Sequence, residues 1–295
     1  MANVLHEYRN GNAQITLYTD GTRIIRTEDD ILNFEYPLNN DITITHKCDG
    51  GCPYCYLGCT ENGKHADILS YKFFDTLLPG TECAINLNDM SHPQLLAFLG
   101  KMKNKGIVVN GTINQKHFMK YWKDLYMLTM QGLIHGVGVS LTAPNEELFN
   151  VLRYFPNAVV HVINGIVSED DIMKMEGQGI KLLILGYKAL RRGEAYLTAN
   201  NDEVAKRQKF LYDYIAGEPK FKAISFDNLA IEQLDARRIV TDEQWEMMYQ
   251  GEEGSATFAI DLVDGTFAVS SSETKTFPIM DDIQEMFKVV KAQCA

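Results

Sequence analysis

Four of the six cysteines in this 295-residue sequence lie between Cys48 and Cys59, and their spacing is the feature that most clearly indicates chemistry. Three residues separate Cys48 from Cys52, and two residues separate Cys52 from Cys55. Thiolates spaced this closely within one loop can converge on a single metal centre. A chain of this length also needs no disulfide bonds to stabilise its fold. The segment therefore predicts a metal or iron–sulfur site.

The number of thiolates in the triplet limits the kind of site. Three thiolates ligate only three irons of a four-iron four-sulfur cluster, whereas clusters that only transfer electrons normally have four cysteine ligands. The fourth iron can then bind another molecule and pass an electron to it. Gly50 and Gly51 would let the backbone curl closely around such a cluster.

Two other uses of the cysteines stay open at this point. Cys59 or His46 could complete a zinc site with the triplet, because structural zinc sites take four ligands. The segment could also be a structural or redox-sensing loop. The spacing and position of the triplet favour the iron–sulfur interpretation over both.

Short β-rich runs alternate with segments of helical spacing from Asp41 onward, and they predict the elements that position the cysteines. Six alternations of strand and helix favour a parallel sheet wound by right-handed crossovers. The triplet directly follows the first strand, and reactive groups of such folds gather at the carboxyl ends of strands. The expected strands are 41–46, 83–88, 106–113, 135–141, 157–163 and 180–186, and the expected helices are 69–78, 92–105, 118–131, 145–155 and 168–178.

Two β-hairpins are expected outside this alternation. One turns at Asp20-Gly21 and the other at Asp264-Gly265, since both dipeptides are strong turn signals between runs of alternating polarity. The second hairpin is a candidate lid or end cap. The sequence thus predicts helices over 202–217 and 281–292, an N-terminal addition over 1–40, a core over 41–228 and a C-terminal extension over 229–295 that packs on the core.

The motif C-x-x-x-C-x-aromatic-C, formed here by Cys48, Cys52, Tyr54 and Cys55, resembles the signature of the radical S-adenosylmethionine superfamily. The resemblance covers roughly residues 41–190 and implies a partial (β/α)6 barrel of the TIM type, in agreement with the six alternations. It implies one four-iron four-sulfur cluster on Cys48, Cys52 and Cys55. The amino and carboxylate groups of S-adenosylmethionine would chelate the fourth iron, and Tyr54 would lie near the adenine.

The resemblance also implies an activity. An electron from the cluster breaks the C5′–S bond of S-adenosylmethionine, and the resulting 5′-deoxyadenosyl radical abstracts hydrogen from a substrate. Reduced flavodoxin or ferredoxin is the expected electron donor, and a small molecule or short peptide is the expected substrate. The alternatives are a non-catalytic iron–sulfur or zinc protein, or radical modification of a peptide or RNA. Cys59, Cys83 and Cys294 are too scattered to hold a second cluster.

The family carries a glycine-rich stretch at the end of the second strand, where the backbone holds the amino group of S-adenosylmethionine. Asn86, Asn88 and Asp89 occupy this position here, and no glycine is present. Their side chains are candidate acceptors for the ammonium group. The alternative is a turn and helix cap, because Asn and Asp are favoured in both.

Residues near the later strand ends are further candidates for cofactor contact. Ser140 ends the fourth strand, and Asn164 follows the fifth, where it is preferred over His161 because it lies closer to the carboxyl end. Lys188 and Arg191 follow the sixth strand and could bind the cofactor carboxylate or an anionic substrate. The alternatives are a turn-forming serine and a solvated helix start.

Charge and hydropathy argue against other classes of function. The 39 acidic and 28 basic residues give a net charge of −11, which disfavours binding to nucleic acid or anionic lipid. No apolar run reaches the roughly 20 residues needed to cross a bilayer, and the first residues lack the pattern of a secretory signal. We therefore expect a cytoplasmic protein that binds no membrane.

Overall fold

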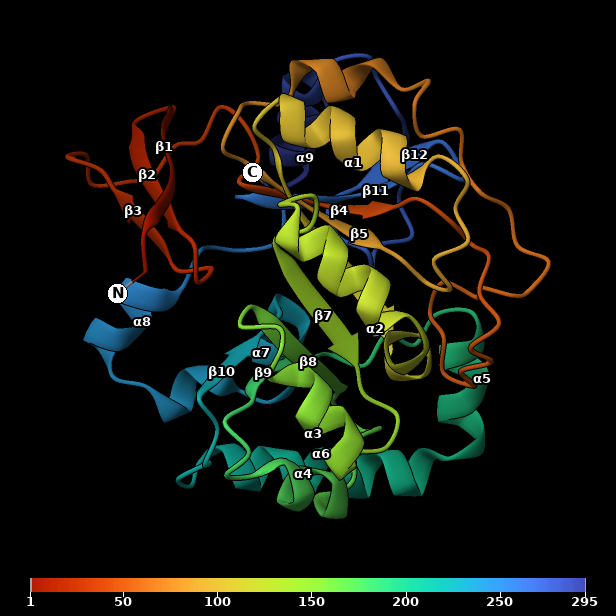
Figure 1. The fold of residues 1–295 in the computed structure, drawn as a ribbon. Coiled ribbons are helices and arrows are strands. Elements are labelled where there is room, and N and C mark those ends of the chain that lie inside the picture. The colour runs from red at the N-terminus through yellow and green to blue at the C-terminus, as the bar shows by residue number, and fades with distance from the viewer. Residues whose placement is uncertain (1, 295) are drawn as a thin grey trace.

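A mostly parallel ten-stranded sheet forms the centre of the computed structural model, which describes residues 2–294 (Figure 1). The predicted α/β class and the six predicted strands are confirmed, with strand ends that differ by up to three residues. All six pair in parallel with their sequence neighbours. They are β4 (Asn39–Thr43), β5 (Glu82–Asn86), β6 (Val108–Asn114), β7 (Gly136–Ser140), β8 (Ala158–Ile163) and β9 (Lys181–Leu185).

Four further strands extend this sheet at its two edges. β10 (Ala223–Phe226) pairs in parallel with β9, and β11 (Thr257–Asp261) pairs in parallel with β4. β12 (Thr266–Ala268) and β13 (Phe277–Pro278) continue in antiparallel order beyond β11. Across residues 2–294, β10 and β13 are the two edges and do not pair with each other.

The C-terminal hairpin is confirmed at Asp264-Gly265, but its first strand belongs to the main sheet. Phe258 and Ile260 of β11 are buried, and the intervening Ala259 lines the internal cavity described below. This alternation is what a strand with one face on the core requires. The first strand of the hairpin therefore extends the main sheet and forms part of the cavity wall.

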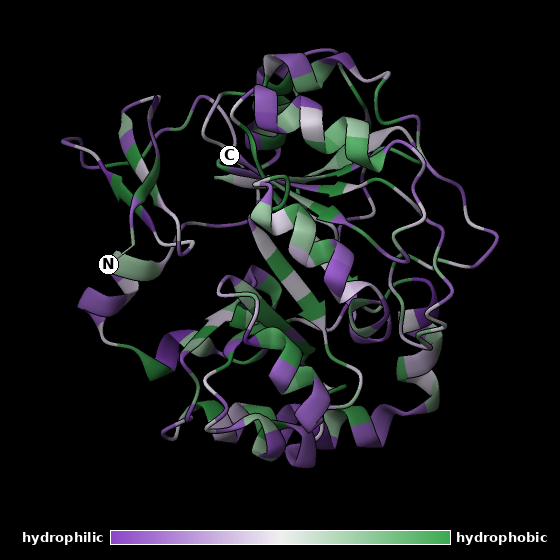
Figure 2. Ribbon diagram, viewed as in Figure 1, coloured by the Kyte–Doolittle hydropathy of each residue, from purple (hydrophilic) through white to green (hydrophobic). Residues whose placement is uncertain are grey.

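Most of the helices lie on the outer face of the sheet, and the helices carry both apolar and hydrophilic residues (Figure 2). The C-terminal helix α9 is an example of this two-sided pattern. Its buried residues recur at the helical period and form one apolar face: Ile283, Met286, Phe287 and Val290. The helices are α1 (Leu95–Asn104), α2 (Gln115–Met130), α3 (Glu146–Leu152), α4 (Glu169–Met175), α5 (Arg192–Ala199), α6 (Asn201–Ile215), α7 (Asn228–Gln233), α8 (Asp242–Met248) and α9 (Ile283–Cys294).

The helix expected over 69–78 is wrong in type and length. The chain forms a short 3-10 helix, η1, over Lys72–Thr76. Its two adjacent aromatic residues, Phe73 and Phe74, are both fully buried. A short, tight 3-10 segment accommodates this pair between loops, whereas the apolar pattern alone suggested a longer α-helix.

The inner face of the sheet lines a cavity of about 1100 Å³. Along β4, Asn39, Asp41 and Thr43 line the cavity, and the intervening Asn40 and Ile42 are buried. β9 repeats the pattern, with alternate residues in the core and in the cavity wall. The sheet therefore presents one apolar outer face and one mixed inner face.

A small antiparallel sheet of β1 (Val4–Asn10), β2 (Ala13–Tyr18) and β3 (Arg23–Arg26) closes the amino end of the cavity. The predicted hairpin at Asp20-Gly21 is confirmed, and β1 was not predicted. Lys181 Nζ donates to the carbonyl of Asp20 at 3.2 Å, and Arg23 pairs with Glu82. Asp20 and Gly21 thus line the cavity at the amino ends of the strands. The cysteines lie at its opposite, carboxyl end.

Within residues 2–294, every helix is too short or too polar to cross a membrane.

Candidate functional site

The cysteine loop leaves the sheet at the end of β4 and is closed at its base by backbone pairing. Cys48 N–H donates to the carbonyl of Thr60 at 2.8 Å, and Thr60 N–H donates to the carbonyl of His46 at 3.1 Å. A Cβ atom on Gly63 would lie only 2.0 Å from the carbonyl oxygen of His46. The two ends of the loop therefore touch at a position where only glycine fits.

Cys48 and Cys52 turn their sulfurs to the same side of the loop, as a shared centre requires. A Cβ on Gly50 would lie 3.2 Å from Cys48 Sγ and 3.9 Å from Cys52 Sγ. Gly50 N–H donates to Cys48 Sγ at 3.4 Å, and Asn114 Nδ2 donates to Cys52 Sγ at 3.5 Å. Such bonds stabilise metal-bound thiolates. Burial raises the pKa of both thiols, so a bound metal is what would hold them deprotonated.

Cys55 and Cys59 also line the cavity and contact each other. A hydrogen bond from the Cys59 thiol lowers the pKa of Cys55 and raises that of Cys59. Asn88 Nδ2 donates to Cys59 Sγ at 3.7 Å. Cys59 is thus the closest available fourth thiol, although it already has two partners.

The spacing of the thiols bears on the choice between the zinc and iron–sulfur interpretations. Ligands about 2.3 Å from a tetrahedral zinc lie roughly 3.8 Å apart. In the part of the chain that the structure describes, only His46, Asp261 and Asp264 bring three such ligand atoms within 4.8 Å of one another. In any three of the four loop cysteines, at least one pair of sulfurs therefore lies more than 4.8 Å apart. A four-iron cluster suits this spread, because each thiolate binds a different iron.

The segment after β9 clamps the cysteine loop. Arg192 Nε donates to the carbonyl of Cys52 at 3.1 Å, and Arg191 donates to the carbonyl of Leu57. Arg191 has a positive φ of 50°. Its guanidinium also lies 3.6 Å from Asp264, in the turn between β11 and β12. Arg191 thus lines the cavity while holding two loops together.

Tyr54 lies where the cysteine motif places it, on the wall of the cavity. Its ring packs edge-on against Tyr196 of α5, with ring centroids 5.7 Å apart. Burial raises the pKa of Tyr54 to about 12, so its hydroxyl is neutral at physiological pH. The residue offers an aromatic surface and a hydrogen-bonding hydroxyl beside the cysteines.

Asn86 and Asn88 line the cavity, but their side chains also bind the backbone that enters the cysteine loop. Asn86 Oδ1 accepts from Ile44 N–H at 2.7 Å, and Asn88 Nδ2 donates to the carbonyl of Lys47 at 2.8 Å. Asn88 has a φ of +47°, a conformation that asparagine tolerates better than most residues. Asn88 therefore makes the turn after β5 without a glycine.

Asp89 does not line the cavity. Its carboxylate accepts from Ser91 N–H at 3.1 Å, which is the turn that the sequence offered as an alternative. The structure thus gives no support for the predicted contact between Asp89 and the cofactor.

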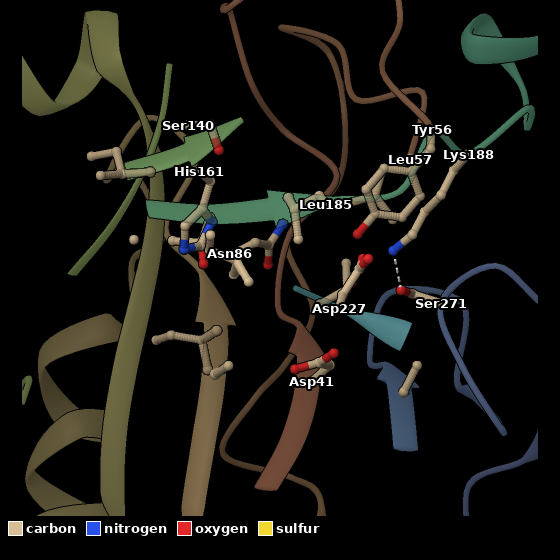
Figure 3. A pocket seen from close by; sticks show the side chains of 18 of the residues that line it. Asp41, Tyr56, Leu57, Asn86, Ser140, His161, Leu185, Lys188, Asp227 and Ser271 are labelled. Carbon is tan, nitrogen blue, oxygen red and sulfur yellow. Dashed lines mark hydrogen bonds between the residues drawn. The ribbon is translucent and has the colours of Figure 1, made fainter. Parts of the chain in front are cut away.

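β8, the fifth strand of the predicted alternation, places His161 rather than Asn164 in the cavity. Ser140 lines the cavity from the end of β7 (Figure 3). The His161 ring lies over Gly138, where a Cβ would come within 2.3 Å of His161 Cε1. Asn164 is fully buried and donates to Gln233 Oε1 at 3.0 Å. The preference for Asn164 is therefore not supported, because strand alternation turns His161 inward.

Acidic pH should destabilise the protein through His161. Burial lowers the pKa of His161 from 6.5 to about 4, so the unfolded chain binds a proton that the folded chain excludes. Stability is fully present above pH 6.5 and should fall as pH drops toward 4, by up to about 1 kcal/mol per pH unit. The free energy of unfolding, measured with a chemical denaturant at several pH values in this range, should depend less steeply on pH for His161→Gln. An unchanged slope would contradict the assignment.

Lys188, a predicted site residue, faces the cavity within a group of polar residues that the sequence analysis did not bring together (Figure 3). Lys188 Nζ donates to Ser271 Oγ at 2.6 Å and lies 4.5 Å from the ring centroid of Tyr56. Asp41 and Asp227 line the same part of the cavity. The sequence could have indicated this group through Asp41, because a carboxylate within a predicted core strand is unusual unless it faces a site. We call these five residues the Lys188 cluster.

His46 joins the cysteine loop to the hairpin that follows β11. His46 Nε2 lies 2.7 Å from Asp261 Oδ2, and this contact raises the pKa of the imidazole. The cysteine loop, β11 and the segment after β9 therefore meet at the carboxyl end of the cavity.

Comparison of the chain with models of known protein families and with characterised proteins finds no match.

Proposed function

We propose that this chain is a radical S-adenosylmethionine enzyme in which Cys48, Cys52 and Cys55 hold one four-iron four-sulfur cluster. The observation that carries the proposal is the C-x-x-x-C-x-Tyr-C triplet in the loop after the first parallel strand, at the mouth of a large cavity. The hydrogen bonds to Cys48 and Cys52 and the wide spacing of the thiols support it. β4 to β9 would then be the six strands of a partial barrel.

The chain's own residues would bind, orient and enclose the reactants. When bound, the cluster and S-adenosylmethionine supply a one-electron cleavage of the C5′–S bond that generates a 5′-deoxyadenosyl radical for hydrogen abstraction. Tyr54 offers a surface for the adenine. Ser140 and the neutral His161 can hydrogen-bond to ribose hydroxyls or substrate from the strand ends. The N-terminal sheet closes the far end of the cavity.

The direct test is anaerobic reconstitution with iron and sulfide, followed by dithionite and S-adenosylmethionine. The proposal predicts formation of 5′-deoxyadenosine and methionine in equal amounts. Cys52→Ala, treated in the same way, is the matched control for non-enzymatic cleavage. A reconstituted cluster that leaves S-adenosylmethionine intact would contradict the proposal.

A basic stripe beside the cysteine loop supports reduced flavodoxin or ferredoxin as the electron donor. Lys116, Lys120 and Lys123 recur on one face of α2 and are exposed. Lys116 Nζ lies 3.5 Å from the carbonyl of Asp49, which is itself exposed in the loop. An acidic one-electron donor would be attracted to this stripe although the whole chain carries a net charge of −11.

Reversing two charges of this stripe should slow electron delivery. Lys116→Glu with Lys120→Glu should lower the rate of cluster reduction by flavodoxin about tenfold at low salt, with less effect at high salt. Stopped-flow absorbance measures this rate. Lys206→Glu with Lys209→Glu, an exposed pair on α6, is the control. Reduction by photoreduced deazariboflavin should be unchanged in both, and equal slowing with either donor would contradict a docking role.

The rival assignment is a metal protein with four cysteine ligands and no S-adenosylmethionine chemistry. Its specific support is the contact between Cys55 and Cys59 at the same end of the cavity. Such a site would leave no iron open for a substrate. Replacement of Cys59 therefore separates the two assignments, as described below.

A further inference from the structure

The charged members of the Lys188 cluster come from segments that meet only in the folded chain. Asp41 lies on β4, Lys188 follows β9, and Asp227 begins α7. Tyr56 directly follows Cys55, and Ser271 follows β12. The cluster therefore lies beside the cysteine loop and within the cavity that it shares with the cysteines.

These charges face the cavity without forming ion pairs. Among the described residues, none of Asp41, Lys188 and Asp227 has an oppositely charged group within 4.0 Å. Asp41 Oδ1 accepts one long bond of 3.3 Å from Asn39. Asp227 Oδ1 accepts from Gly186 N–H and Ala230 N–H, each at 2.8 Å. Asp41 is exposed on the cavity wall, and Lys188 and Asp227 are half-buried, so all three charges are accessible to a molecule in the cavity.

The cluster carries an excess of negative charge. Two carboxylates face one ammonium group, and Glu253 acts on the same lysine from nearby. Burial alone would lower the pKa of Lys188, but Tyr56, Asp227 and Asp41 outweigh it, and the pKa is raised. Desolvation raises the pKa of Glu253 to about 7 and also raises the pKa of Asp41, whereas Lys188 lowers both. A bound cation would likewise favour the ionised carboxylates, so a positively charged group would complement this part of the cavity.

We propose that Asp41 and Asp227 bind a protonated amino group of the substrate, while Lys188 and Ser271 position a hydrogen-bond acceptor of the same molecule. This inference deepens the proposed function and rests on it. The substrate class is a small polar amine that fits beside the cysteine loop. An ammonium group is also present in S-adenosylmethionine, so the test must separate these two sources.

The probe is 4-aminobutanamide, which carries one ammonium group and one amide acceptor, with its uncharged N-acetyl derivative as the matched control. Isothermal titration calorimetry on the anaerobically reconstituted chain measures binding without any turnover. We expect the amine to bind at least tenfold more tightly than the N-acetyl compound, which corresponds to about 1.4 kcal/mol. Asp41→Asn, which keeps the side-chain shape, should weaken amine binding about tenfold and change the affinity for S-adenosylmethionine less than twofold.

Glu273→Gln is the control variant, because it removes one negative charge from another residue of the cavity wall. It should change the affinity for the amine less than twofold, about 0.4 kcal/mol. Equal binding of the amine and its N-acetyl derivative, or equal effects of the two variants, would overturn the inference. A loss confined to S-adenosylmethionine in Asp41→Asn would also overturn it and assign the carboxylate to the cofactor. Amine binding without 5′-deoxyadenosine formation would instead contradict the proposed function.

Discussion

Replacing Cys52 with alanine is expected to remove the cluster and, with it, the formation of 5′-deoxyadenosine. Cys52 is one of three proposed ligands, and its sulfur shares one side of Gly50 with that of Cys48. Loss of a hydrogen bond to a metal ligand typically costs about 10–100-fold in metal affinity, so loss of the ligand itself should cost more than 100-fold. Iron and acid-labile sulfide per chain, measured after anaerobic reconstitution, should fall to background.

Cys59→Ala is the matched control for this prediction. Cys59 lies at the same end of the cavity and contacts Cys55, but it is not one of the three proposed ligands. The variant should retain its iron and sulfide, with a loss in folding stability of about 1 kcal/mol because Asn88 loses a partner. Equal loss of iron from Cys59→Ala and Cys52→Ala would mean that four thiolates bind the metal, which contradicts an open iron.

Gly63→Ala should destabilise the chain and empty the cysteine site without changing any ligand. The added methyl group would lie 2.0 Å from the carbonyl oxygen and 2.3 Å from the carbonyl carbon of His46. Both are backbone atoms at the base of the loop, so the clash can be relieved only by opening the loop. We expect a loss of about 3 kcal/mol in the free energy of unfolding, together with reduced iron content.

Gly100→Ala is the same substitution as Gly63→Ala, but we expect it to raise the free energy of unfolding rather than lower it. Gly100 lies within α1, and no atom would come within 4 Å of an added Cβ. Alanine is favoured over glycine in a helix by about 1 kcal/mol, so this variant should be slightly more stable. Urea unfolding of both variants measures the difference. Similar stability of Gly63→Ala and the unchanged chain would show that the loop base is not held as described.

Local patterns were sufficient to predict the six central strands and the position of the cysteine loop. β-rich runs, helical spacing and Asp-Gly turns each depend on residues close in sequence, and the structure confirms these elements except the helix expected over 69–78. The pairing of β11 with β4 could not be predicted in this way. Ala259 and Asp41 are partners there, although more than two hundred residues separate them in the sequence. Nothing local indicates such a pairing.

The candidate site was predicted less completely than the fold, for identifiable reasons. The choice between His161 and Asn164 depends on which way one strand faces, and a shift of one residue reverses it. Asn86 and Asn88 were expected to face the cofactor, but their bonds to the loop backbone appear only in three dimensions. Asp41 lay within a predicted strand, and its importance emerges only when Lys188 and Asp227 are placed near it.

The most direct test of the central claim is pulsed electron–nuclear double resonance of the reduced chain with isotopically labelled S-adenosylmethionine. The label is nitrogen-15 in the amino group or oxygen-17 in the carboxylate. Binding of both groups to an iron that lacks a protein ligand predicts a resolved hyperfine coupling from each label to the cluster. A reduced cluster that shows no coupling to either label would contradict the three-cysteine assignment.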